Sequence, residues 1–221
     1  MKSEIRLARN WPMSKVRQCL DHKRKSELAR FIRERYVERF FQPLQNLSRL
    51  PGNQQGYGFA IMALCCLLIE TLESYRLGLP STNYRELKNL RQIPVIPTRY
   101  RIPDKKHWPR KGGEVFNGFF VHYAEFFQGL NGYEFCDGVR NGLLHQAQTR
   151  NGWSISVRGV SLFSTRTKRI NRNVFSRNLR ECFEQYLVEL EGASWTDQVW
   201  RNAERKIWWL LKLSQAGYKK S

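Results

Sequence analysis

Residues 59–69 have the sequence FAIMALCCLLI, which is the longest apolar run in the chain. Apolar side chains occupy every position of the run instead of one face, and a helix that is hydrophobic all round belongs in the interior of a protein. The run is about half as long as a membrane-spanning helix needs to be, so we expect no membrane insertion. It predicts the central helix of a hydrophobic core and favours a fold built from helices around it.

Helical periodicity continues on both sides of this core helix. Apolar residues recur at steps of three and four from Ser14 to about Leu47, where Pro43 should kink or end the last turns. Further helices are predicted over residues 114–128, 133–148, 171–191 and from 194 onward. Residues 153–157 alternate like a strand, and residues 160–163 supply a partner. The pattern predicts an all-α helical bundle of about five main helices with a small β-hairpin after the helix at 133–148.

The charge balance is the unusual feature of the composition. The chain of 221 residues has 38 Lys and Arg against 19 Asp and Glu, a formal charge of +19 and a pI of about 10.2. Self-repulsion of this size opposes folding, and a polyanionic partner is the usual reason for it. RNA, DNA and an anionic membrane surface are the candidate partners, and a basic protein that is merely soluble is the alternative.

Cysteine and histidine usage indicates a cytoplasmic protein without a metal site or another cofactor. The five cysteines show no CxxC spacing, and Cys65 and Cys66 are adjacent, which is typical of reduced thiols. None of the four histidines is paired at metal-ligand spacing. The first fifteen residues are charged and include Trp11-Pro12, so they do not resemble a secretory signal.

The chain is predicted to form one helical domain over residues 14–221, preceded by a flexible basic N-terminus at 1–13. Its least regular part is a Pro/Arg/Lys-rich loop at 79–113, where cations and aromatic rings interleave as contact with single-stranded RNA requires. The candidate nucleic-acid-binding residues are Arg99, Arg101, Lys105, Lys106, Trp108, Arg110 and Lys111. A disordered basic connector is the alternative, although the loop is long for an idle segment of a compact domain.

Residues 139–147 have the sequence VRNGLLHQA, in which polar groups interrupt an apolar helix. Arg140, Asn141 and His145 cost free energy to bury unless they are hydrogen-bonded or open onto a cleft. On a helix, Asn141 and His145 share a face, and the long Arg140 side chain can swing back toward the imidazole. These three residues are the candidate catalytic set, because an imidazole can transfer protons near neutral pH and a guanidinium can bind two phosphoryl oxygens.

This set suits the cleavage of RNA by attack of the 2′-hydroxyl on its own phosphate. The reaction requires no metal, because the protein has only to transfer protons and to stabilise charge. One histidine serves both proton transfers poorly, so a symmetric dimer that supplies two copies is part of the hypothesis. Glu70, which follows the core run, is a candidate supporting residue. It can pair with a basic residue in the core, lie near the site, or be exposed at the helix edge.

The spacing Arg140-x4-His145, with the polar Asn141 straight after the arginine, resembles the motif of the HEPN superfamily. Members are all-α domains, commonly metal-independent endoribonucleases of toxin–antitoxin, phage-defence and RNA-processing systems, whose two motifs meet at a homodimer interface. The resemblance implies that Arg140 and His145 are catalytic, that Asn141 positions them or the phosphate, and that a regulatory partner or antitoxin controls the homodimer. One subgroup of toxins has a tyrosine two residues after the histidine, where this chain has Ala147, so control by modification of that tyrosine is not expected.

Other interpretations of these patterns stay open. Arg140, Asn141 and His145 can form a buried hydrogen-bond network that holds the helix in register. The chain would then be a non-catalytic RNA- or DNA-binding helical protein, or an interaction module whose aromatic helix at 114–128 docks a partner. The prediction set against them is an RNA-cutting protein of the bacterial toxin or antiviral defence type.

Overall fold

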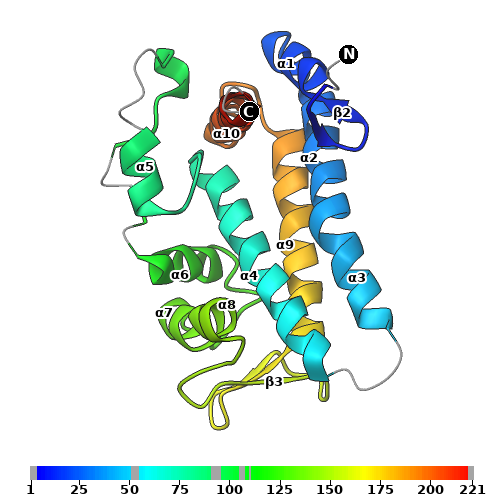
Figure 1. The fold of residues 1–221 in the computed structure, drawn as a ribbon, viewed down its shortest axis with the longest axis vertical. Helices are drawn as coiled ribbons and strands as arrows, with labels where there is room; N and C mark the ends of the chain where they lie inside the picture. Colours follow the sequence, from blue (N-terminus) through cyan, green and yellow to red (C-terminus); the bar gives the residue numbers. More distant parts are fainter. Residues whose placement is uncertain (1–3, 51–54, 91–95, 105–107, 110, 219–221) are drawn as a thin grey trace. The chain divides into compact units, whose positions relative to one another are not determined.

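The computed structural model describes residues 4–50, 55–90, 96–104, 108–109 and 111–218 (Figure 1). Helix accounts for 66% and strand for 7% of the structure, so the predicted all-α class is confirmed. The α-helices are α1 (Met13–Asp21), α2 (Lys25–Tyr36), α3 (Gln42–Arg49), α4 (Gln55–Leu77), α5 (Tyr84–Leu90), α6 (Gly112–His122), α7 (Gly132–Phe135), α8 (Gly142–Gln146), α9 (Arg172–Gly192) and α10 (Gln198–Tyr218). The shorter elements are β1 (Arg6–Ala8), β2 (Trp11–Pro12), β3 (Ser154–Ser156), β4 (Phe163–Ser164), β5 (Arg169–Asn171), the π-helices η1 (Val37–Phe41) and η4 (Cys136–Asn141), and the 3₁₀-helix η2 (Thr98–Tyr100).

The chain divides into two compact units, which the prediction of a single domain over 14–221 does not anticipate. Unit 1 comprises Met1–Arg39, Ser74–Trp108 and Gln185–Ser221, and unit 2 comprises Phe40–Glu73 and Pro109–Glu184. Unit 1 has 26 Lys and Arg against 11 Asp and Glu, whereas unit 2 has 12 against 8. The excess positive charge of the chain therefore belongs mainly to unit 1.

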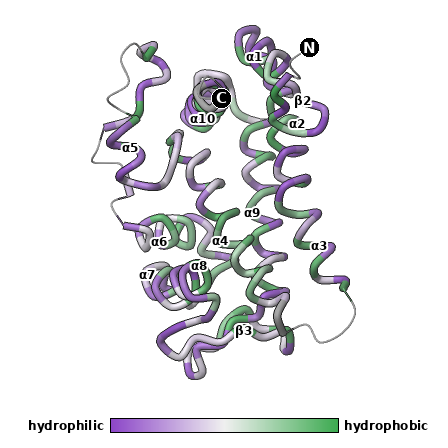
Figure 2. The backbone as a smooth tube through the Cα atoms, in the orientation of Figure 1, coloured by the Kyte–Doolittle hydropathy of each residue, from purple (hydrophilic) through white to green (hydrophobic). Residues whose placement is uncertain are grey.

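The apolar run at 59–69 forms the middle of α4, and its side chains build much of the core of unit 2. Its buried members are Ile61, Met62, Cys65, Cys66, Leu68 and Ile69. Cys65 makes a side-chain hydrogen bond with Ser176 of α9. All five cysteines of the chain are free and buried. Figure 2 shows hydrophobic positions along α4, α6 and α9, in contrast to the hydrophilic α1 and α5.

By length and composition alone, one helix of the described chain could cross a membrane. This is the segment Tyr57–Leu77 of α4, with a mean hydropathy of 1.5, and 56% of its most apolar window lies buried inside the protein. The prediction of a run too short to span considered residues 59–69 alone, whereas Leu72 and Tyr75 extend the apolar surface. A buried core helix passes this test as readily as a membrane span does.

Phenylalanines from three segments complete the core of unit 2. Phe116, Phe119 and Phe120 of α6 are buried, and the rings of Phe135 and Phe175 stack with centroids 5.3 Å apart and planes at 10°. Helix α6 ends at His122 rather than at the predicted residue 128, and the chain continues in turns. The aromatic stripe that the sequence places on this helix therefore faces the interior of the unit.

A three-stranded sheet replaces the predicted β-hairpin in unit 2. Strands β3 and β4 do not pair with each other, because β5 lies between them, parallel to β3 and antiparallel to β4. The sequence predicts a helix that starts at Asn171, which is the last residue of β5. The central strand of the sheet was therefore not predicted. Asn171 caps α9 instead, since its Oδ1 accepts hydrogen bonds from the backbone amides of Asn173 and Val174.

The N-terminus of unit 1 is not the flexible basic segment predicted for residues 1–13. From residue 4 onward it is ordered, and β1 pairs with β2 in an antiparallel ribbon. Trp11 is fully buried, and its indole Nε1 donates to Glu34 of α2 at 2.7 Å. The apolar residues Leu7, Ala8 and Trp11, which the charged surroundings obscure in the sequence, hold this segment in place.

The long helix predicted over residues 14–47 is interrupted twice. Lys23 adopts a left-handed backbone conformation with φ of 53°, which separates α1 from α2. The π-helix η1 then joins α2 to α3 immediately before Pro43. A proline ring clashes with the carbonyl of the preceding turn and supplies no amide hydrogen, and the change in winding lies in that preceding turn.

The Pro/Arg/Lys-rich segment at 79–113 contributes a hydrophobic core to unit 1. It contains α5 and η2, and the buried residues packed together there are Leu79, Leu87, Leu90, Ile102, Trp108 and Trp209. Trp108 is 3% exposed, and its indole Nε1 donates to the carbonyl of Pro103 at 2.8 Å. Trp108 is therefore a core residue and not the base-stacking contact that the sequence pattern predicts.

A buried lysine makes the stability of unit 1 sensitive to pH. The Nζ of Lys206 in α10 donates to the carbonyl of Pro80 at 2.7 Å. Burial, reinforced by the charge of Arg35, lowers the pKa of Lys206 from 10.5 to about 7, whereas Glu86 acts in the opposite direction. Between these two values the unfolded chain holds a proton that the folded chain has lost, so the free energy of unfolding rises with pH in this window.

We expect Lys206→Met to increase the free energy of unfolding most below pH 7 and to lose this advantage as the pH rises. The wild-type protein should gain stability relative to the variant, on the order of 4 kcal/mol, between about pH 6 and about pH 10. Urea unfolding at several pH values measures the difference. Lys212→Met, at an exposed position of the same helix, is the control and should show no such window. Parallel pH profiles for wild type and Lys206→Met would contradict the prediction.

Candidate active site

The motif at 139–147 lies on a helix that changes its winding. Helix α7, the π-helix η4 and α8 run without interruption from Gly132 to Gln146. Asn131 caps the start, because its Oδ1 accepts hydrogen bonds from the backbone amides of Tyr133 and Glu134. Arg140 and Asn141 belong to the π turn and His145 to the last turn of α8. Single π turns within helices are frequent at functional sites.

Arg140 is held by two partners in unit 2. Its Nε lies 2.8 Å from Oε1 of Glu70 on α4, and the two side chains are 25% and 19% exposed. Its Nη1 donates to Oδ1 of Asn141 at 3.2 Å. Among the residues that the structure describes, Nη2 of Arg140 has no hydrogen-bond partner. The guanidinium is thus held at Nε and at Nη1, and Nη2 remains available as a donor.

Glu70 therefore pairs with a basic residue, Arg140, and lies near the candidate site. These are two of the three placements that the sequence left open. Asn141 hydrogen-bonds Arg140, whereas the helical spacing pairs it with His145. The Arg140 side chain is long enough to place Nη1 beside the amide of the adjacent Asn141. The side chain of Asn141 orients the guanidinium through Nη1, and Glu70 does so through Nε.

Two buried thiols lie close to this ion pair. Burial raises the pKa of Cys66 well above its usual value, and the neighbouring Cys65 and Glu70 add to the effect. Burial also raises the pKa of Cys136 to about 11, although Arg140 opposes the shift. Both groups remain neutral thiols at physiological pH, so they line the site without supplying a nucleophilic thiolate.

The segment after α8 folds back against the motif helix. Ala147 ends the helix in a left-handed conformation with φ of 53°, and the amide of Arg150 donates to the carbonyl of Gly138 at 2.7 Å. A Cβ on Gly142 would lie 2.4 Å from the carbonyl oxygen of Gln148, and one on Gly138 would lie 2.2 Å from the Trp153 ring. Both glycines therefore permit close packing of this return segment, defined here as residues 147–153.

His145 is exposed on the last turn of α8. Its imidazole has no hydrogen-bond or ion-pair partner among the side chains described. Gln146 and Arg150 lie close to His145 in the sequence but are not part of the motif. Nε of Arg150 donates to Oε1 of Gln146 at 2.9 Å. Arg150 was not among the predicted site residues, because Arg150 lies outside the helix and comes near the motif only through the return segment.

The predicted nucleic-acid-binding residues do not form one described site. Arg99 and Arg101 are exposed in unit 1, whereas Lys111 is exposed in unit 2. Lys105, Lys106 and Arg110 lie outside the described residues. Trp108 is buried, as shown above.

Within the described ranges, no three His, Cys, Asp or Glu side chains are grouped as metal ligands. Comparison of the chain with protein-family models, curated proteins and solved structures finds no match.

A double-mutant cycle tests how the ion pair contributes to folding. Glu70→Leu and Arg140→Met should each lower the free energy of unfolding by about 2 kcal/mol, because each leaves a largely buried charge without its partner. The double variant should recover most of this loss, since both charges are then absent. Urea unfolding at neutral pH measures all four proteins.

Lys168 and Glu134 provide the matched control for this cycle. They are 3.9 Å apart, and their side chains are 43% and 58% exposed, so the same cycle there should change the free energy of unfolding by less than about 1 kcal/mol. If the single variants at Glu70 and Arg140 unfold at the same urea concentration as the wild-type protein, the pair does not hold the motif helix in place.

Proposed function

We propose that the protein is a metal-independent endoribonuclease that cleaves single-stranded RNA at the motif of unit 2, in the manner of the HEPN superfamily. The observation that carries the proposal is the state of the three motif side chains. Arg140 is fixed by Glu70 and Asn141 with Nη2 available as a donor, and His145 is exposed and uncommitted five residues later. A network that served only to hold the helix would have no use for an exposed imidazole.

The proposed chemistry assigns one role to each group. The 2′-hydroxyl oxygen attacks the adjacent phosphorus, the bond from phosphorus to the 5′-oxygen breaks, and a 2′,3′-cyclic phosphate and a 5′-hydroxyl result. His145 takes the proton of the 2′-hydroxyl or supplies the proton of the leaving 5′-oxygen. Arg140 donates from Nη2 to a phosphoryl oxygen, where charge accumulates in the transition state. Asn141 and Glu70 keep the guanidinium in position.

A second copy of the chain completes the proposed site. One imidazole cannot readily be both base and acid in a single turnover, and a symmetric dimer supplies the second. We propose a cytoplasmic homodimer, of toxin or antiviral defence type, whose activity a regulatory partner or antitoxin restrains. This part of the proposal rests on the resemblance of the motif to the HEPN superfamily.

A non-catalytic RNA-binding protein is the second candidate, and one observation favours it. The pair between Arg140 and Glu70 joins two helices in the manner of a purely structural contact. The third candidate, a docking module that presents its aromatic helix, is weakened because Phe116 and Phe119 of α6 are fully buried.

We expect His145→Ala to reduce cleavage of single-stranded RNA at least about 100-fold, the range of a lost general acid or base, while RNA binding is retained. Cleavage should proceed in EDTA and yield 2′,3′-cyclic phosphate ends, which mass spectrometry of the products identifies. His122→Ala changes another exposed histidine of the same unit and should preserve both cleavage and binding.

Three outcomes separate the candidates. Wild-type protein that binds RNA but never cuts it supports the non-catalytic alternative. Equal cleavage by wild type and His145→Ala contradicts the assignment of His145. The Glu70→Leu, Arg140→Met double variant should be folded yet inactive, and an active double variant would remove Arg140 from the mechanism.

A further inference from the structure

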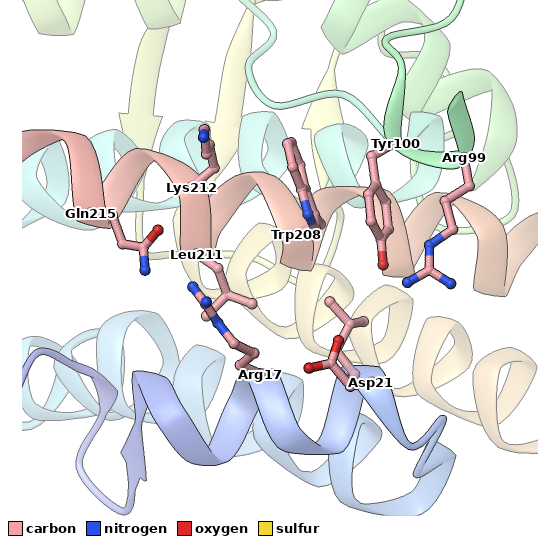
Figure 3. Close-up of a pocket in the computed structure, with 9 residues that line it drawn as sticks. Arg17, Asp21, Arg99, Tyr100, Trp208, Leu211, Lys212 and Gln215 are labelled. Atoms are coloured by element: carbon pink, nitrogen blue, oxygen red, sulfur yellow. The ribbon is translucent and has the colours of Figure 1, made fainter. Parts of the chain in front are cut away.

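Unit 1 contains a pocket of ≈ 290 Å³ between α1, η2 and α10 (Figure 3). Helix α10 contributes Trp208, Leu211, Lys212 and Gln215, which share one face because they are three and four residues apart. Helix α1 contributes Arg17 and Asp21 by the same spacing, and η2 contributes Arg99 and Tyr100. The pocket combines a planar aromatic wall with charged groups, and its volume suits about one nucleotide.

The aromatic wall is a stack of three flat groups. The rings of Tyr100 and Trp208 are parallel to within 14°, with centroids 4.8 Å apart. The guanidinium of Arg99 lies 4.5 Å from the centroid of the Tyr100 ring. Figure 3 shows the order Arg99, Tyr100, Trp208 along α10.

The stack is fixed in place and ends in a partly exposed ring. The hydroxyl of Tyr100 donates to Oε1 of Glu204 at 3.3 Å, and Nε of Arg99 lies 3.7 Å from the same oxygen. Burial raises the pKa of Tyr100 to about 12, so this hydroxyl keeps its proton. Trp208 is only partly buried, and Figure 3 places Leu211 and Lys212 on the side of it away from Tyr100.

The cations beyond Trp208 are uncommitted. Arg17 and Lys212 are exposed, and neither takes an ion pair or hydrogen bond among the residues described. Asp21 is the only carboxylate among the described residues lining the pocket, so the pocket has an excess of positive charge. Because unit 1 also holds most of the positive charge of the chain, an anion is attracted toward it over longer distances.

Arg99 connects this pocket to a second one. The second pocket, of ≈ 390 Å³, is also lined by Arg99, together with Lys23, Arg201, Arg205 and Trp195. Two adjacent pockets that share a cation and each contain tryptophan and arginine match consecutive nucleotides of a strand better than they match one small molecule.

We propose that the pocket between α1, η2 and α10 binds an unpaired nucleotide of single-stranded RNA, with its base stacked on Trp208 and its phosphate at Arg17 and Lys212. The base extends the stack of Arg99, Tyr100 and Trp208 by one member. Asp21 repels the phosphate from its own end of the pocket and accepts a hydrogen bond from the ribose or the base. The inference takes its ligand from the proposed function but concerns binding alone, and it does not require His145 to be catalytic.

The test measures binding in a protein that cannot consume its ligand. All variants carry His145→Ala, and fluorescence polarisation follows a fluorescein-labelled oligoadenylate of about eight nucleotides over a range of salt concentrations. Arg17→Ala with Lys212→Ala should weaken binding about tenfold and lower the slope of log K against log salt by about 1.4, the value for two lost phosphate contacts on a single strand. Trp208→Leu should weaken binding about tenfold, whereas Trp208→Phe should retain most of it.

Arg85→Ala with Lys88→Ala is the matched control. It removes the same two charges from exposed positions of α5 in the same unit, and it should leave affinity and salt slope unchanged. Equal weakening by both charge variants would overturn the proposal, because general attraction would then suffice. Equally tight binding of duplex RNA would also overturn it, because a paired base cannot reach Trp208.

Two competitors identify the source of the nucleotide. If adenosine monophosphate displaces the oligonucleotide from the protein with Trp208 but not from the Trp208→Leu variant, a single nucleotide fills the pocket. Displacement by unlabelled oligoadenylate alone supports a strand that needs both pockets. If the protein without the His145→Ala change binds RNA but does not cleave it, this result contradicts the proposed function and leaves the binding inference intact.

Discussion

The ion pair between Glu70 and Arg140 is the contact on which the candidate active site depends. A carboxylate on an apolar core helix costs several kcal/mol unless a cation or hydrogen-bond donors satisfy it, and Arg140 supplies both at 2.8 Å. A largely buried pair contributes little net stability compared with apolar side chains of the same size. Its effect is therefore positional: it ties the motif helix to α4 and fixes the guanidinium at Nε.

Backbone packing sets the remaining geometry of the site. Gly138 and Gly142 let the return segment approach the motif helix more closely than any side chain would allow. Ala147 adopts a left-handed conformation that costs an alanine about 1–2 kcal/mol, so the packing of Trp153 against Gly138 has to offset this strain. The result is a helix that ends at Gln146, one residue after His145, and leaves the imidazole exposed.

The sequence predicts the elements whose evidence is local. The apolar run of α4, the amphipathic α9 and the motif helix follow from periodicity, whereas the cost of a carboxylate in such a run left pairing, a place near the site and exposure open for Glu70. Periodicity does not reveal the π turns, because they change the hydrogen-bond register without changing which residues are apolar. It also misses β5, which has only three residues and runs directly into α9. Trp108 was misplaced because composition cannot distinguish a ring that faces bases from one that fills a core.

The two proposals assign the binding of RNA to unit 1 and its cleavage to unit 2. Unit 2 has an excess of only 4 positive charges and Arg140 is already paired, so the proposed site would orient a phosphate but attract a polyanion weakly. Unit 1 has an excess of 15 positive charges and exposed cations beside an aromatic stack, which suits capture of a strand and not its cleavage. Exposed charges are screened by salt, whereas a largely buried pair is screened much less. Under these proposals, affinity therefore varies with ionic strength, while the geometry around the Glu70–Arg140 pair does not.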